Sequence, residues 1–177
     1  MSYTKEFVDL DKTIHGRGLF DCGEPELNSF IRGQAARLMD AGISKTLVLP
    51  ASISLPNGKT PICAFYTITS TQIKREDLPE PLAKTLPRYP IPVFLLAQLA
   101  VHCEFKGMGL GKVALVSALQ YFYNISAHMP AYAVVVDCLN KNAESFYLKY
   151  GFQELCKHNH RSRLFLSMKD VATLFQD

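Results

Sequence analysis

Three glycines stand at every second position in the segment Phe105–Lys112, which reads FKGMGLGK and follows the apolar run Val93–Val101. Glycine adopts backbone conformations in which successive N–H groups point into one concavity. A helix that begins at the end of such a loop adds the positive end of its dipole. The spacing therefore predicts an anion site suited to a pyrophosphate. The alternative is a plain turn between strand and helix, for which one glycine would suffice.

Two common phosphate loops do not fit this segment. A Walker A loop reads G-x-x-x-x-G-K-[ST], but the spacing from Gly107 to Gly111 is one residue short, and Val113 replaces the hydroxyl that would bind magnesium. A dinucleotide fingerprint reads G-x-G-x-x-G, but Lys112 occupies its last position. We therefore expect an anion loop of another kind, without a metal.

Hydrophobic periodicity indicates the elements that must position this loop. Apolar residues at helical spacing predict helices over residues 25–41, 110–123 and 140–151. Apolar runs predict strands over residues 7–10, 45–52, 61–73, 93–101, 131–139 and 163–168. The strand over 93–101 is expected to be buried on both faces. Residues 74–92 hold five prolines and are expected to form a surface loop. This order is typical of the α/β (α+β) class.

Length and composition place the chain among globular proteins. Its 177 residues are 48% apolar and 20% charged, and we expect one domain over residues 1–177. The longest apolar run is about half of what a membrane-spanning helix needs, and the N-terminus lacks a signal-peptide pattern. Five scattered cysteines without a C-x-x-C pair indicate reduced thiols in a cytoplasmic protein. The net charge of +3 permits nucleic-acid binding without arguing for it.

Two segments resemble motifs of the GCN5-related N-acetyltransferases. LAVHCEFKGMGLGKVAL is similar to motif A, [QR]-x-x-G-x-[GA], with Lys106 in place of the usual Gln or Arg and with Gly109 and Gly111 at the two small positions. DCLNKNAESFYLKYGF is similar to motif B. The resemblance implies a mixed, mostly antiparallel sheet of about six to seven strands flanked by about four helices.

The resemblance also implies acetyl-CoA as cosubstrate. The pyrophosphate would bind the amides of residues 107–112, Lys106 would meet phosphate as a point charge, and the pantetheine arm would run beside residues 99–101 like an added strand. The implied cofactor-binding residues are Leu99, Ala100, Val101, Lys106, Gly107, Met108, Gly109, Leu110, Gly111, Lys112, Asn140 and Phe146.

Tyr147 matches the motif B tyrosine that protonates the leaving thiolate in this superfamily. A phenol with a pKa near 10 is a proton donor at neutral pH. The alternative is a core aromatic residue beside Phe146. Asn140 has two possible roles, in holding pantetheine or in capping the helix that follows. A general base is not evident, because neither His102 nor Glu104 stands in a pattern that assigns it that role.

A narrower resemblance covers almost the whole chain. FDCGEPELNSFI, AFYTI and IPVFLLAQLAVHCEFKGMGLG together are similar to the acetyltransferase toxins of type II toxin–antitoxin modules. The resemblance implies transfer of acetyl to the α-amino group of aminoacyl-tRNA, which blocks translation. It further implies a ribbon-helix-helix antitoxin as partner and a homodimer.

A tRNA acceptor requires basic surface, and residues 157–163, KHNHRSR, contain no acid. Phosphate contacts from such residues would give salt-sensitive binding without sequence preference. The alternative for this run is a solvated hairpin. The candidate nucleic-acid-binding residues are Lys84, Arg88, Lys157, Arg161 and Arg163.

Two other functions remain open at this point. One is an acetyltransferase acting on a small-molecule amine or on a protein or peptide amine, for which an acidic patch would be expected. Glu76, Asp77 and Glu80 are the acidic candidates, but basic residues are interleaved with them. The other is a binding module that uses a CoA pocket without catalysis.

Overall fold

The computed structural model describes residues 2–4 and 6–176. The chain divides into two compact units, one comprising residues 1–69 and 97–118 and the other residues 70–96 and 119–177. Two long strands, β4 (Thr60–Ile73) and β5 (Ile91–Val101), each contribute residues to both units.

The first unit holds the N-terminal strands and the helices around them. β1 (Val8–Asp9) pairs antiparallel with β3 (Lys45–Pro50), and β3 pairs antiparallel with β4. β5 follows β4 in the order, and the short β2 (His15–Gly16) runs parallel to β4. The helices are α1 (Pro25–Gly33), α2 (Ala35–Asp40), the 3₁₀ turn η2 (Cys103–Phe105) and the first part of α4 (Leu110–Ser126).

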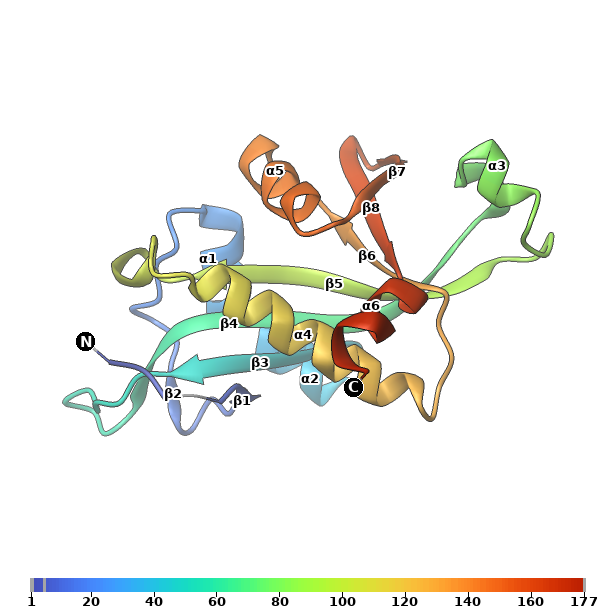
Figure 1. Cartoon of the computed structure of the whole chain (residues 1–177). Helices are drawn as coiled ribbons and strands as arrows, with labels where there is room; N and C mark the ends of the chain where they lie inside the picture. Colours follow the sequence, from blue (N-terminus) through green and yellow to red (C-terminus); the bar gives the residue numbers. More distant parts are fainter. Residues whose placement is uncertain (1, 5, 177) are drawn as a thin grey trace. The chain divides into compact units, whose positions relative to one another are not determined.

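Side chains on the two faces of β3 and β4 enter different cores, because successive residues of a strand alternate between faces. Val48 and Phe65 pack in a cluster with Phe30 of α1 and Ala35 of α2. The adjacent residues Leu49 and Ala64 instead pack in a cluster with Phe105 and with Leu110 at the start of α4. Figure 1 accordingly shows α4 in front of β3 and β4 and α2 behind them. The anion loop thus leads into the helix on one face, whereas α1 and α2 cover the other.

The second unit is built on the order β5-β6-β8-β7. β6 (Ala133–Asp137) pairs antiparallel with β8 (Arg161–Ser167), which forms a hairpin with β7 (Gln153–His158). Its further helices are η1 (Arg75–Asp77), α3 (Glu80–Ala83), α5 (Lys141–Lys149) and α6 (Met168–Phe175). Val93, Val135, Leu155 and Phe165 belong to the buried core of these strands.

The predicted fold class is confirmed, with corrections to single elements. The helix predicted over residues 25–41 is two helices, because the φ of Gln34 widens to −119° after the poor helix former Gly33. The predicted loop over residues 74–92 contains η1 and α3. Pro81 lies in the first turn of α3, where proline is tolerated. β7 and α6 were missed, although Ser167 caps α6 by accepting a hydrogen bond from the N–H of Asp170.

β5 differs from the prediction of a strand buried on both faces. Its first half is mostly buried, but Ala97, Gln98, Leu99 and Val101 are only half-buried. Across the part of the chain that the structure describes, no helix is both long and apolar enough to span a bilayer.

Candidate functional site

The glycine loop has the open backbone that an anion site requires. Gly107 and Gly109 have φ values of 80° and 79°, a region in which residues with a Cβ are strained. A Cβ added at either glycine would meet no heavy atom within 4 Å, so the backbone faces open space. The segment from Phe105 to Lys112 contains no acidic side chain that would repel an anion.

The helix that follows adds N–H donors to the loop. α4 begins at Leu110, which is buried and therefore fixes the position of the helix start. The N–H of Val113 makes a helical bond with the carbonyl of Gly109 (3.2 Å). Gly111 and Lys112 precede Val113 in the first turn of α4. The N–H groups in the first turn of a helix have no acceptor within the helix, so they are donors for an anion. The residues present therefore fit a pyrophosphate group.

The side chain of Lys106 reaches the FDCG segment, and its predicted contact with phosphate stays a prediction. Its ammonium donates a hydrogen bond to the backbone carbonyl of Cys22. Its Nζ would lie 3.6 Å from a Cβ built on Gly23. Lys106 thus connects the anion loop to the FDCG segment near the N-terminus.

Further hydrogen bonds hold the FDCG segment against the start of the loop. The N–H of Cys103 donates to the carbonyl of Asp21 (2.8 Å). The Asp21 carboxylate accepts from the N–H of Gly23 (2.8 Å) and from Nδ2 of Asn28 (3.0 Å). Asn28 Oδ1 accepts in turn from the N–H of Cys22 (2.9 Å). The early motif therefore supports the loop, a role that pattern matching had not assigned.

The end of β5 carries the residues predicted to lie beside pantetheine. Ala100 is buried on the side of α1 and α2, whereas Val101 packs beside Phe105 and Leu110. In the second unit, the parallel ladder between β5 and β6 consists, for the described residues, of the pairs Phe94–Val134 and Leu95–Val135. The contact of residues 99–101 with pantetheine stays a prediction.

Tyr147 is a buried residue of α5, with 7% of its surface exposed. Its ring makes edge contacts with Phe146 (5.2 Å between centroids) and Phe152 (5.3 Å), so it also packs the core. Burial, with a smaller effect of Cys138, raises the pKa of the phenol. The hydroxyl makes no hydrogen bond to another described residue, and it remains protonated throughout the neutral range. It is therefore available as a proton donor.

Asn140 caps α5, which confirms the structural alternative for this residue. Its Oδ1 accepts a hydrogen bond from the N–H of Ala143 (2.9 Å). Phe146 contacts Tyr147 and Tyr150 through ring edges. The contacts predicted for Asn140 and Phe146 with the cofactor stay predictions.

Arg163 is not a surface residue, so its prediction as a nucleic-acid contact is wrong. Its exposed fraction is 6%, and its Nε and Nη2 donate to the two carboxylate oxygens of Asp137 (2.7 and 2.8 Å). The register of β6 and β8 places these two residues opposite each other. The bidentate pair occupies the Nε and Nη2 edge of the guanidinium, and burial of the side chain keeps its other donors from phosphate at the surface.

The other basic candidates stay on the surface. Lys157 is exposed on the β7–β8 hairpin and donates to Ser162 Oγ (2.7 Å), and Arg161 is half-buried on the same hairpin. Lys84 lies 3.7 Å from Glu80 in an exposed ion pair, and Arg88 is exposed. Because exposed pairs are weak, Lys84 can exchange its partner for a phosphate.

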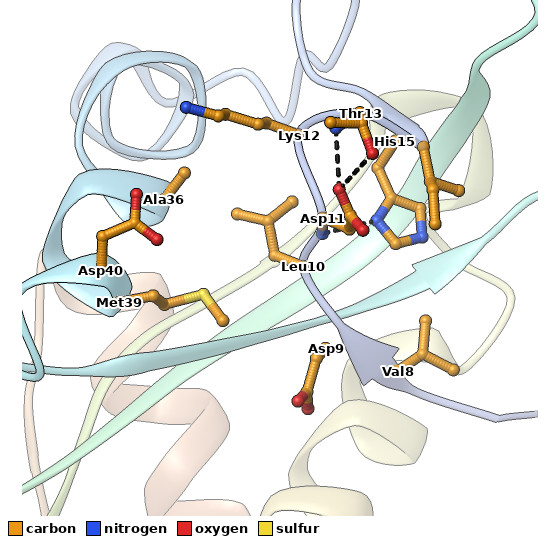
Figure 2. A pocket seen from close by; sticks show the side chains of 11 residues that line it. Val8, Asp9, Leu10, Asp11, Lys12, Thr13, His15, Ala36, Met39 and Asp40 are labelled. Atoms are coloured by element: carbon orange, nitrogen blue, oxygen red, sulfur yellow. Dashed lines mark hydrogen bonds between the residues drawn. The ribbon is translucent and has the colours of Figure 1, made fainter.

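A pocket of about 660 Å³ lies in the first unit, lined by residues 8–15 and by Ala36, Met39 and Asp40. None of the predicted site residues lines it. Figure 2 shows Asp11 facing Thr13, whose N–H and Oγ1 donate to its carboxylate (2.9 and 2.6 Å). The N–H of Asp11 donates to Nδ1 of the buried His15 (3.0 Å), so the neutral ring carries its proton on Nε2.

The His15 environment predicts a pH dependence of stability. Burial lowers the pKa of His15 below 6.5, so the unfolded chain binds this proton more readily than the folded protein. The free energy of unfolding should therefore fall as pH drops from about 6.5 to the folded pKa. Urea unfolding at a series of pH values between about 7.5 and 5 should show a shallower slope for His15→Gln. Parallel slopes for both proteins would contradict this assignment.

Among the described residues, no group of three or more His, Cys, Asp or Glu side chains is arranged to hold a metal ion.

Known proteins resemble this chain in both sequence and fold. Residues 80–162 match the FR47-like protein family. The chain is 28% identical over 173 residues to the probable toxin TacT of Sinorhizobium fredii, an alignment that covers 93% of this chain and 92% of that protein.

Solved structures of toxins share the fold along nearly the whole chain. The crystal structure of a tyrosine-to-phenylalanine mutant of KacT has a TM-score of 0.87 at 25% identity, covering 99% of this chain and 100% of that chain. AtaT complexed with acetyl-methionyl-tRNAfMet has a TM-score of 0.83 at 25% identity, covering 97% and 99%. The resemblance to the GCN5-related acetyltransferase toxins is therefore confirmed.

Two further structures show the fold of these toxins with their partners. A tyrosine-to-phenylalanine mutant of AtaT bound to the C-terminus of the antitoxin AtaR has a TM-score of 0.82 at 22% identity, and AtaTR bound with AcCoA has a TM-score of 0.80 at 24% identity. Each covers 97% of this chain and 98% of its own. Structures of AtaT thus include complexes with antitoxin, acetyl-CoA and acetylated tRNA.

Proposed function

We propose that this protein is an acetyl-CoA-dependent N-acetyltransferase toxin, which acetylates the α-amino group of aminoacyl-tRNA and so blocks translation. One observation carries the proposal: the open glycine loop at the start of α4 occurs in a chain that shares its fold, at 25% identity, with AtaT solved in complex with acetyl-methionyl-tRNAfMet. The two compact units together make up one acetyltransferase domain over residues 1–177.

The loop and the end of β5 provide the binding groups for the cosubstrate. Backbone N–H groups of residues 107–112 hold the pyrophosphate, and the side of β5 at Leu99–Val101 pairs with the pantetheine arm. Acetyl-CoA supplies a thioester as the activated acyl group. The Lys106 ammonium acts through the loop backbone and not by phosphate contact.

Acetyl transfer requires the protein to position the two substrates and to supply one proton to the leaving sulfur. A backbone N–H at Leu99 or Val101 polarises the thioester carbonyl, and the Tyr147 hydroxyl donates its proton to the leaving sulfur. The α-amino group of an aminoacyl ester has a pKa below the value of about 8 of a free α-amino group, so much of it is unprotonated at neutral pH. A strong general base is therefore not required.

The proposed function also implies a tRNA substrate, an antitoxin and a second copy of the chain as partners. The acceptor tRNA is held by phosphate contacts from Lys84, Arg88, Lys157 and Arg161, in a cytoplasmic protein. A ribbon-helix-helix antitoxin binds and neutralises the toxin, which acts as a homodimer. The AtaT structure with the C-terminus of AtaR supports an antitoxin partner of some kind.

Removal of the Lys106 anchor is expected to weaken acetyl-CoA binding. Lys106→Met should raise the Kd for acetyl-CoA by about 10-fold, because the loop loses a charged hydrogen bond to Cys22. Isothermal titration at low and at roughly 0.5 M salt separates the two possible roles. An effect equal at both salt concentrations indicates anchoring, whereas an effect that disappears at high salt would show direct phosphate contact and contradict it.

The experiment that tests the proposal is transfer of labelled acetyl from acetyl-CoA to total aminoacyl-tRNA. Uncharged tRNA, a polyamine and a peptide serve as competing acceptors in parallel reactions. We expect label on charged tRNA alone. Label on the polyamine or the peptide, with none on charged tRNA, would replace the proposal by an acetyltransferase of small or protein amines.

A further inference from the structure

The Gln98 side chain of β5 has a buried carbonyl oxygen without a hydrogen-bond donor. Among the described residues, Gln98 Oε1 and Ser44 Oγ are the two buried side-chain atoms that lack a partner. Buried polar groups are nearly always hydrogen-bonded, so each exception calls for an explanation. Gln98 directly precedes Leu99, the residue whose backbone lies beside the reacting group in the proposed function.

The direction of Gln98 follows from the alternation of side chains along β5. Gln98 and Ala100 share one face, and Ala100 packs in the cluster that contains Phe30 and Ala35. Val101 points to the other face, toward Phe105 and Leu110 at the start of α4. Gln98 therefore lies on the face of α1 and α2, opposite the helix that begins at the anion loop.

In this position the unpaired Oε1 of Gln98 can take part in the reaction as a hydrogen-bond acceptor. Because the anion loop leads into α4, a thioester held from that side leaves the opposite face of its carbonyl to the attacking amine. On that opposite face, the unpaired Oε1 of Gln98 offers a hydrogen-bond acceptor. A neutral amide accepts a hydrogen bond from an amine N–H without taking its proton, so it orients the nucleophile without acting as a base.

We propose that Gln98 positions the acceptor, its Oε1 accepting a hydrogen bond from the α-amino group of the aminoacyl-tRNA. This inference rests on the proposed function and adds the residue that orients the amine for its attack on the thioester. An unpaired buried acceptor lowers the stability of the free protein, and the substrate supplies the missing donor.

The experiment compares Gln98→Met, which keeps the size of the side chain but removes the acceptor, with Gln98→Glu, which keeps an acceptor. For Gln98→Met we expect an unchanged Kd for acetyl-CoA, an equal or higher Tm, and a kcat/KM for aminoacyl-tRNA that is lower by about 10- to 100-fold. Gln98→Glu should recover most of the loss in kcat/KM. Higher stability with lower activity is a combination that a merely structural glutamine would not give.

Ser44→Ala is the matched control, since it removes the other unpaired buried acceptor. It should leave kcat/KM unchanged while its Tm stays equal or rises. If the wild-type protein acetylates aminoacyl-tRNA and Gln98→Met does so equally well, the positioning role is wrong and the proposed function stands. If the wild-type protein acetylates no aminoacyl-tRNA at all, the proposed function fails and the role of Gln98 fails with it.

Discussion

Tyr147→Phe is expected to lower the kcat of acetyl transfer by about 10²- to 10³-fold, because a positioned proton donor contributes rate factors of this order. The change should leave the fold intact. The ring packs against Phe146 and Phe152, and the hydroxyl makes no hydrogen bond to a described residue that its removal would break. Single-turnover transfer of labelled acetyl measures the loss, and thermal unfolding and acetyl-CoA titration provide the controls.

The pH dependence of kcat tests the same role. Burial raises the pKa of Tyr147 above that of an ordinary phenol, so the group stays protonated through the accessible range. The kcat profile of the wild-type protein should therefore show no falling limb from this residue below about pH 10. A limb between about pH 8 and 9 that disappears in Tyr147→Phe, or an unchanged kcat in that variant, would contradict the assignment of Tyr147 as the acid.

Arg163→Met is expected to lower the free energy of unfolding by about 2–4 kcal/mol, since it leaves the Asp137 carboxylate without its partner inside the protein. The lower part of this range allows for the 21% exposure of the Asp137 side chain, over which solvent screens the charge. The Nε–Oδ1 distance of 2.7 Å and the bidentate geometry make the pair a strong one. Urea unfolding at neutral pH measures the difference.

The double variant Asp137→Leu/Arg163→Met separates loss of the pair from loss of packing. Removing both charges should recover part of the stability, because no uncompensated charge remains. Lys157→Met on the same hairpin serves as the control, since its partner Ser162 is neutral and its position exposed. A single Arg163 variant that unfolds within about 0.5 kcal/mol of the wild type would show that the pair contributes nothing.

The parts of the site that local rules determine were predictable from the sequence. Alternating glycines between a strand and a helix predicted the open backbone at Gly107 and Gly109, and the positive φ values agree with it. The Asn140 cap followed from the residue type that precedes a helix. Most strands were predictable because continuous apolar runs, such as Ala133–Val136 in β6, have few alternatives to burial.

Features that depend on contacts between distant residues were not predictable. The register of β6 and β8 pairs Asp137 with Arg163, and it removes from the surface an arginine that its neighbours in KHNHRSR suggested was exposed. Lys106 reaches Cys22, 84 positions away, so a pattern centred on the loop could not show its partner. The break at Gln34 has a local signal in the preceding Gly33, but the apolar periodicity that residues 25–41 share conceals it.

Acetylation of the α-amino group of aminoacyl-tRNA by this chain can be observed directly by mass spectrometry of the reacted tRNA. After incubation with acetyl-CoA, nuclease digestion releases the terminal aminoacyl-adenosine, whose mass and fragments locate the acetyl group. We expect N-acetyl-aminoacyl-adenosine with the wild-type protein and very little with Tyr147→Phe. Unmodified aminoacyl-adenosine with the active wild-type protein, or acetyl on the nucleobase or ribose, would contradict it.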